Sequence, residues 1–408
     1  MHDLATTVIL LAALQGAVLA PILWSRSANR LANRILAVLV AAVALLLLQG
    51  DLSMRFAFNG HPHLLGLGSP LPFLFGPLLY LYVIALTRPV VRLDSRWSVH
   101  LLPFAADILY MSQVFYMKTG AEKVVLARAA DAGHAPASYY VMNALLVVQA
   151  LVYVSLAWRA LNSYERKIRG YFSDLARIDL RWLRRLIQAH VSVWSVVLAG
   201  DLLWMVGRGP RALGPTVALG SSVVIFLTGY VSLWQPELAE KASAAKMSEE
   251  GPSADAPNEP VVSPLAAPDA PPSPLPRYQR NRLDEREATQ LATKLEALMA
   301  EKHVYRDGAL TLPVLADAVG EAPHTLSQVL NVRIGKSFFV FVNTYRVEAL
   351  KKALADPSKS ERGVLELALE VGFNSKSTLN SFFKKHTGLT PTEFRARAQT
   401  KTPMISGT

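Results

Sequence analysis

The sequence has 408 residues, of which 51% are hydrophobic and only 18% are charged, and its formal net charge is +11. Such an apolar chain points to membrane spans, and the excess of Lys and Arg suits nucleic acid, the cytoplasmic ends of membrane helices, or both. Cysteine is absent, which excludes disulfides, thiolate catalysis and zinc sites with Cys ligands.

The apolar residues are distributed unevenly, and they divide the chain into three parts. They crowd into residues 1–236, which we interpret as a membrane domain of about seven spans. Residues 237–280 are rich in Pro and Ala, residues 281–400 have the composition of a soluble domain, and 401–408 form a tail. We expect an all-α protein: a helical membrane bundle, a disordered linker and a helical soluble domain.

Seven apolar stretches approach the length of about 20 residues that a helix needs to cross a bilayer. They are Ala5–Trp24, Ile35–Leu52, Leu71–Thr87, Val99–Met117, Tyr139–Trp158, Leu186–Val206 and Leu213–Trp234. With the N-terminus outside, the inner loops hold 14 Lys and Arg residues and the outer loops hold 6. The positive-inside rule therefore predicts an outside N-terminus and a cytoplasmic C-terminal half.

The third inner loop is the longest of the inner loops, and it combines an Arg-rich face with Ile178, Leu180, Trp182 and Leu183. Two interpretations remain open. The loop is either an extension of the sixth span or a segment at the headgroups that relays movement of the spans to the linker.

Ionisable residues inside spans are costly and often functional. Asp107 falls near mid-span, Asp51 and Asp201 toward outer ends, and His190 nearer an inner end. These four residues are candidates for a signal-binding site in the membrane. The alternative is that they fix helix packing through hydrogen bonds, as Asn143 and Gln149 could also do.

The stretch between the two halves contains Gly251–Pro257 and Pro268–Pro274, where hydrophobic side chains are sparse. This composition predicts a disordered and partly polyproline-like tether. A flexible tether of about 40 residues has a root-mean-square reach on the order of 35 Å. The domain that follows could therefore leave the membrane surface while staying near it.

The soluble half begins with an amphipathic helix over Leu283–Lys302, and an internal repeat follows it. Ala316 and Ala368 lie 52 residues apart, as do Gly320 and Gly372. Three further pairs lie 53 residues apart: Leu326 with Leu379, Leu330 with Phe383, and Gly335 with Gly388. Each unit has a helix with a small Ala, a Gly at its end, a polar turn and a second apolar-faced helix. This order is typical of a helix-turn-helix.

The second unit resembles the pattern of AraC/XylS-type transcription regulators. The similarity is carried by Val364–Ser375, Ser377–Lys385, Gly388–Pro391 and Phe394-Arg395, and in the first unit by Asn331, Gly335–Phe339 and Asn343–Arg346. It covers roughly Ala309–Ala398, with units at about 309–346 and 362–398. The first unit departs from the pattern in Pro323 and in having few basic residues on its recognition helix.

The resemblance implies which side chains read DNA. Leu379 and Phe383 face inward, which leaves base contacts to Lys376, Ser377, Asn380 and Ser381. In the first unit, inward Leu326 and Leu330 leave His324, Ser327 and Gln328. Arg333, Lys384 and Lys385 are expected to contact phosphates. The net charge of +6 from residue 277 onward agrees with this role.

We therefore predict a multi-pass regulator of the bacterial inner membrane with a cytoplasmic DNA-binding domain. Its expected partners are double-stranded DNA and the lipid bilayer, and further candidates are a second copy of the chain, RNA polymerase and an unknown signal molecule. We expect no catalytic residues, cofactor or metal. Two alternatives remain: an integral membrane enzyme or transporter with a regulatory DNA-binding tail, or spans that serve only as an anchor.

Overall fold

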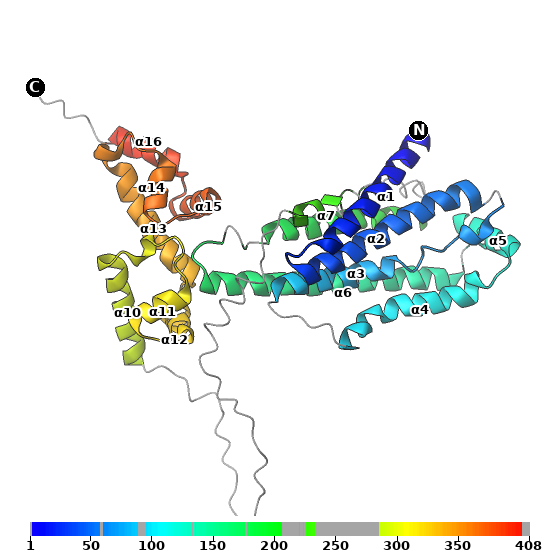
Figure 1. Ribbon diagram of the computed structural model, residues 1–408, viewed down its shortest axis with the longest axis horizontal. Coiled ribbons are helices and arrows are strands. Elements are labelled where there is room, and N and C mark those ends of the chain that lie inside the picture. The colour runs from blue at the N-terminus through cyan, green and yellow to red at the C-terminus, as the bar shows by residue number, and fades with distance from the viewer. Residues whose placement is uncertain are drawn as a thin grey trace, which may run out of the picture. The chain divides into compact units, whose positions relative to one another are not determined.

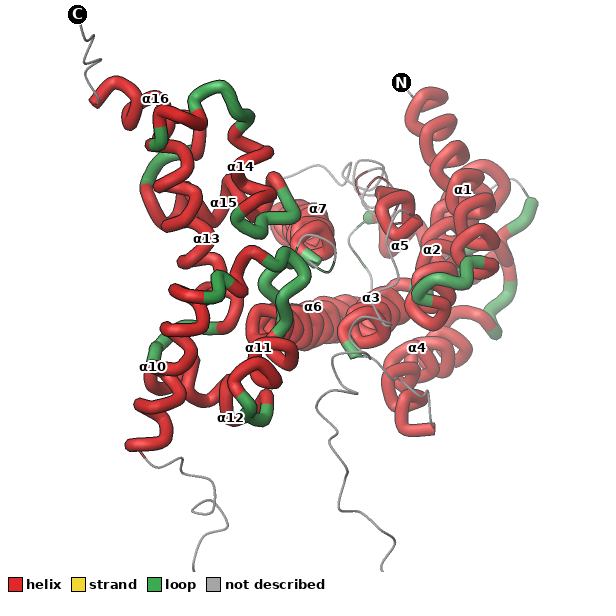
Figure 2. Tube along the Cα trace, turned by 60° about the vertical axis from the view of Figure 1, so that its left-hand side comes forward, coloured by secondary structure: helices red, strands yellow, loops and turns green. Residues whose placement is uncertain are grey.

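The computed structural model describes residues 2–57, 60–88, 95–132, 136–175, 180–205, 229–233 and 285–401, with a few further residues between these ranges. The described residues form helices and no named strand, which confirms the all-α class (Figure 2). They divide into two compact units. The first is Met1–Tyr164 with Leu180–Ala242, and the second is Glu165–Asp179 with Ser243–Thr408. The predicted linker, residues 237–280, and the tail lie outside the described residues, apart from Lys401.

The first unit contains most of the predicted spans. Three helical stretches are long and apolar enough to cross a membrane: Thr7–Ser25, Arg30–Ala57 and Ala137–Tyr171. They correspond to α1 (His2–Ser25), α2 (Arg30–Leu52) with the π-helical turn after it, and α6 (Ala137–Tyr171). The helix α3 (Pro72–Thr87) is apolar but shorter, and the unit also contains α5 (Gly120–Asp131) and α7 (Arg181–Met205).

Two predicted spans are not seen as single continuous helices. One is divided into shorter segments, and the other lies largely outside the described residues. Val99–Met117 is divided between a 3-10 helix over Ser95–Leu101, α4 (Leu102–Met111) and a π-helical turn over Ser112–Tyr116. Pro103 lies at the start of α4, where its fixed φ suits the first turn of a helix but interrupts one that arrives from upstream. Leu213–Trp234 lies largely outside the described residues. The count of seven spans therefore stays a prediction.

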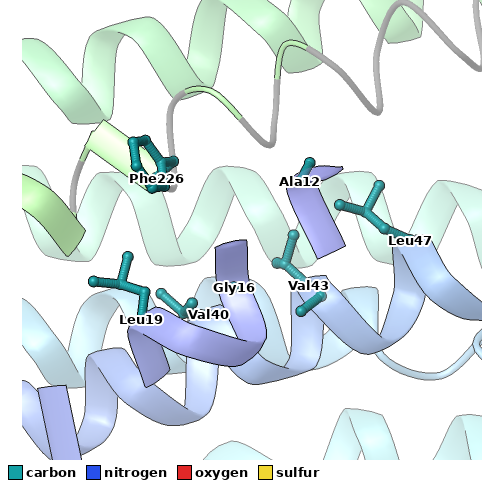
Figure 3. Close-up of a pocket in the computed structure, with 8 residues that line it drawn as sticks. Ala12, Gly16, Leu19, Val40, Val43, Leu47 and Phe226 are labelled. Carbon is teal, nitrogen blue, oxygen red and sulfur yellow. The ribbon is translucent and has the colours of Figure 1, made fainter. Parts of the chain in front are cut away.

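Helices α1 and α2 pack closely through small residues. A Cβ added to Gly16 would lie 2.7 Å from the Ala44 Cβ, so glycine permits this approach. Beside the contact is a cavity of about 20 Å³, enough for one water molecule. Figure 3 shows the apolar side chains around it, and the lining residues are Ala12, Gly16, Leu19, Val40, Val43, Ala44, Leu47 and Phe226. The cavity contains none of the predicted signal residues.

The second unit begins with α10 (Glu285–Glu301), which buries Leu291, Leu295 and Met299 and so confirms the predicted amphipathic helix. One helix-turn-helix follows in α11 (Leu312–Val319), α12 (Pro323–Gln328) and a π-helical turn, η7 (Val329–Arg333). A second comprises α14 (Val364–Glu370) and α15 (Lys376–Thr387), with α16 (Pro391–Lys401) after it.

A long helix, α13 (Phe338–Ala355), joins the two helix-turn-helix units. In its first half, Phe338, Phe341 and Val342 pack in the core of the first helix-turn-helix. In its second half, Val347, Leu350 and Leu354 pack in the core of the second helix-turn-helix. Figure 1 shows α11 and α12 at one end of α13 and α14 and α15 at the other. The spacing of the two recognition helices is therefore set by one continuous helix.

Candidate nucleic-acid interface

The second recognition helix, α15, is fixed at its start by a capping hydrogen bond. Ser375 is the N-cap, and its Oγ accepts a hydrogen bond from the Thr378 backbone N–H at 3.3 Å. Before it, Gly372 ends the preceding helix with φ +97°, a conformation that favours glycine. This turn sets the direction in which the helix leaves the domain.

Burial along α15 separates an inner face from an outer one. Leu379 and Phe383 are 2% and 0% exposed, and the Phe383 ring packs edge-on against Phe394. The four predicted base-contacting side chains are all exposed: Lys376, Ser377, Asn380 and Ser381. The inward and outward assignment made from sequence is therefore confirmed, although contact of these residues with DNA stays a prediction.

The first recognition helix has the same inner face but a different shape. Leu326 and Leu330 are fully buried, while His324 is exposed and Ser327 and Gln328 are half-buried. Pro323 occupies the first turn of α12, a position that proline's fixed φ suits. After Gln328 the helix widens into the π-helical turn η7, which the sequence pattern did not predict.

A residue that the sequence analysis did not assign to DNA lies on this turn. Asn331 is exposed, and its Nδ2 donates to the Ser327 carbonyl oxygen at 2.9 Å and to Ser327 Oγ at 3.3 Å. Ser327 is therefore engaged by Asn331, and the amide oxygen of Asn331 is a further candidate for reading a base. The predicted phosphate-contacting residues Arg333, Lys384 and Lys385 are all exposed.

A buried arginine lies between the two helix-turn-helix motifs. Arg346 of α13 is 0% exposed, and its guanidinium donates to the carbonyl oxygens of Tyr305 and Asp307, each at 2.7 Å. Burial lowers the pKa of Arg346 to about 10, while the carboxylates of Asp174 and Asp307 act in the opposite direction. Arg346 is thus charged at neutral pH. The sequence analysis quoted it as part of the AraC-like pattern without assigning it a role.

Of the four candidate signal residues, the structure describes the side chains of two, Asp51 and Asp107, so a shared signal site stays a prediction. Asp51 is 7% exposed and forms an ion pair with Arg55 at 2.9 Å. Asp107 is 3% exposed, and its Oδ2 has no hydrogen-bond partner among the described residues. The side chains of His190 and Asp201 lie outside the described residues. Gln149 Nε2 donates to the Phe73 carbonyl oxygen at 2.9 Å, which matches the packing interpretation for this amide.

Comparison with known proteins identifies the part of the chain that contains both helix-turn-helix motifs. Residues 315–397 match a family model described as a helix-turn-helix domain. These residues form a helix-turn-helix domain of the AraC type.

The AraC-type domain is also similar to an uncharacterized HTH-type transcriptional regulator of Staphylococcus aureus (strain COL), with 32% identity over 95 residues. That match covers 23% of this chain and 12% of the relative, so it spans a small part of the relative's length. No solved structure matches the chain. The comparisons therefore show an AraC-type helix-turn-helix domain within this chain.

Proposed function

We propose that the chain is a membrane-bound transcription regulator whose AraC-type domain binds a specific DNA sequence and whose membrane part senses a signal. The observation that carries the DNA-binding part is the pair of recognition helices. Each has a buried apolar face and an outer face of short polar or basic side chains at its N-terminal end. Such helices place these side chains against base edges in the major groove.

The membrane part of the proposal is supported by composition and by buried charge. Three helical stretches have the length and hydropathy of spans, and the loop charges favour a cytoplasmic AraC-type domain. The buried Asp107 suits a sensing role better than a simple anchor, because an acidic group inside a membrane domain is costly to keep. The chemistry of the signal stays open.

Selection of binding sites from a random pool of double-stranded DNA tests the DNA-binding part. The full chain, held in a lipid nanodisc, should enrich a defined motif. The variant Lys376→Ala/Asn380→Ala should lose the enrichment, because each base contact contributes roughly 1–3 kcal/mol of discrimination. Gln399→Ala, an exposed change on α16, is the matched control and should enrich the same motif. Enrichment by the double variant equal to that of the control would show that α15 does not read DNA.

A further inference from the structure

A short segment from far upstream is part of the DNA-binding unit. Residues Glu165–Asp179, which include the last turns of α6 and the chain after it, belong to the same compact unit as the AraC-type domain. Tyr171 packs against the core of the first helix-turn-helix. Phe172 forms an antiparallel bridge with Thr311, and Ser173 and Leu175 are buried. We call Tyr171–Leu175 the docked segment.

Hydrogen bonds hold the docked segment at the junction of the two helix-turn-helix units. Ser173 Oγ donates to the Leu310 carbonyl oxygen at 2.6 Å. The Ser173 carbonyl oxygen accepts from Asn343 Nδ2 at 2.9 Å. The contact therefore involves both the start of the first unit and the joining helix α13.

The docked segment also completes the environment of Arg346. The guanidinium donates to Ser173 Oγ at 3.1 Å and to the Ser173 carbonyl oxygen at 3.4 Å, besides its bonds to Tyr305, Asp307 and Asn343. A buried cation is tolerated only while its donors are satisfied. Departure of the segment would expose those donors to water, so a docked and an undocked domain would differ in the solvation of Arg346.

The docked segment contacts the starts of two helices, one in each helix-turn-helix. Thr311 is the N-cap of α11, the first helix of its unit, and the first helix is the one that crosses the DNA backbone. Asp174 Oδ1 accepts from Thr378 Oγ1 at 3.4 Å, in the first turn of α15. The starts of helices attract phosphate. The Asp174 carboxylate, beside the first turn of α15, repels it.

We propose that the docked segment and DNA compete for this face of the AraC-type domain, which is formed by Thr311, Asn343, Arg346 and Thr378. The segment must leave before the domain binds its site. Because it is continuous with α6, a candidate membrane span, movement of α6 is the natural trigger. The inference rests on the proposed function and adds to it the element that restrains DNA binding.

The absence of cysteine from the chain allows a direct test. Opposed residues of an antiparallel bridge have Cα atoms about 4.5–5.5 Å apart, within the range of about 4.4–6.8 Å that a disulfide spans. The full-length variant Phe172→Cys/Thr311→Cys in a nanodisc should therefore form an intramolecular disulfide. Oxidation should weaken binding to a labelled duplex carrying the selected motif by about tenfold or more, because only undocked chains bind. Reduction should restore binding.

Two sets of variants complete the experiment. Phe172→Cys and Thr311→Cys alone should show no dependence on oxidation. Asp174→Ala should bind the duplex a few-fold more tightly than the unaltered chain, because it removes the repulsive carboxylate and the bond to Thr378.

The results separate failure of the inference from failure of the proposed function. Equal affinity of the oxidised and reduced double-cysteine variant would overturn the competition, and so would a disulfide that does not form, while DNA binding itself would stand. If neither the reduced variant nor Asp174→Ala enriches or binds any duplex, the proposed function is wrong, and the inference falls with it.

Discussion

Gly320 and Gly372 hold equivalent places in the two helix-turn-helix units, but their surroundings differ. Both have positive φ, +75° and +97°. A Cβ on Gly320 would meet no atom within 4 Å, whereas one on Gly372 would lie 2.4 Å from the Tyr305 carbonyl oxygen. Gly320 is therefore required for its backbone conformation alone. Gly372 is required also because the backbone of Tyr305 and Arg306 packs directly against it.

This difference predicts unequal costs of the same substitution. Gly320→Ala should lower the free energy of unfolding of the AraC-type domain by about 1–2 kcal/mol through the left-handed backbone alone. Gly372→Ala should cost about 3 kcal/mol or more, since backbone must also shift. Hydrogen exchange of the full chain, read by mass spectrometry on α14 and α15, should show clearly faster exchange for Gly372→Ala. Similar exchange in the two variants would contradict the packing argument.

Single residues also show where sequence reasoning reached its limit. The inward positions of Leu326, Leu330, Leu379 and Phe383 could be predicted because they recur at helical spacing. The burial of Arg346 could not, because its acceptors lie on Tyr305, Asp307 and Ser173, far apart in the chain. A pattern within one helix carries no information about such partners.

At the scale of elements, α13 connects two recognition helices of unlike form. The helix α15 is regular over 12 residues, while α12 has 6 and continues as a π-helical turn. The repeat predicted both units, but it could not predict the π turn, because the paired residues Leu330 with Phe383 and Gly335 with Gly388 lie 53 apart, so the sequence spacing is the same in both units. The same limit applies to Val99–Met117, which is mostly apolar yet is divided among three helical segments.

A two-part DNA footprint follows from this arrangement. Hydroxyl-radical footprinting of the selected motif should give two protected patches one helical turn apart, about 10–10.5 base pairs. The variant His324→Ala/Gln328→Ala should lose protection in one patch, and Lys376→Ala/Asn380→Ala in the other. A single patch that both variants affect equally would mean that one unit alone reads DNA.

At the scale of the whole molecule, the proposal requires that the AraC-type domain be on the side of the membrane where the chromosome is. The predicted topology places Ser27 in an inner loop and Lys118 in an outer loop, and both side chains are exposed. In intact cells, a membrane-impermeant maleimide should label Lys118→Cys and should label Ser27→Cys only after the cells are broken. The reverse pattern would place the C-terminal half outside and would rule out regulation from the membrane.

The organisation of the chain was the part most accessible from sequence, because hydropathy and composition change sharply along it. The helical class and the AraC-type domain are confirmed, while seven spans, orientation and sensing stay predictions. The docked segment had no sequence signal. The third inner loop stood out for its charge and apolar residues, but its predicted partners were the headgroups and the linker rather than the AraC-type domain.

Chromatin immunoprecipitation with sequencing of the full-length protein tests the central claim most directly. The account predicts discrete promoter peaks for the unaltered chain or for Asp174→Ala, in cells where the protein is in the membrane fraction. The peaks should disappear when Lys376→Ala/Asn380→Ala is introduced and persist with Gln399→Ala. Peaks that survive the double substitution, or the absence of peaks from both the unaltered chain and Asp174→Ala, would contradict a membrane-bound regulator that reads DNA through α15.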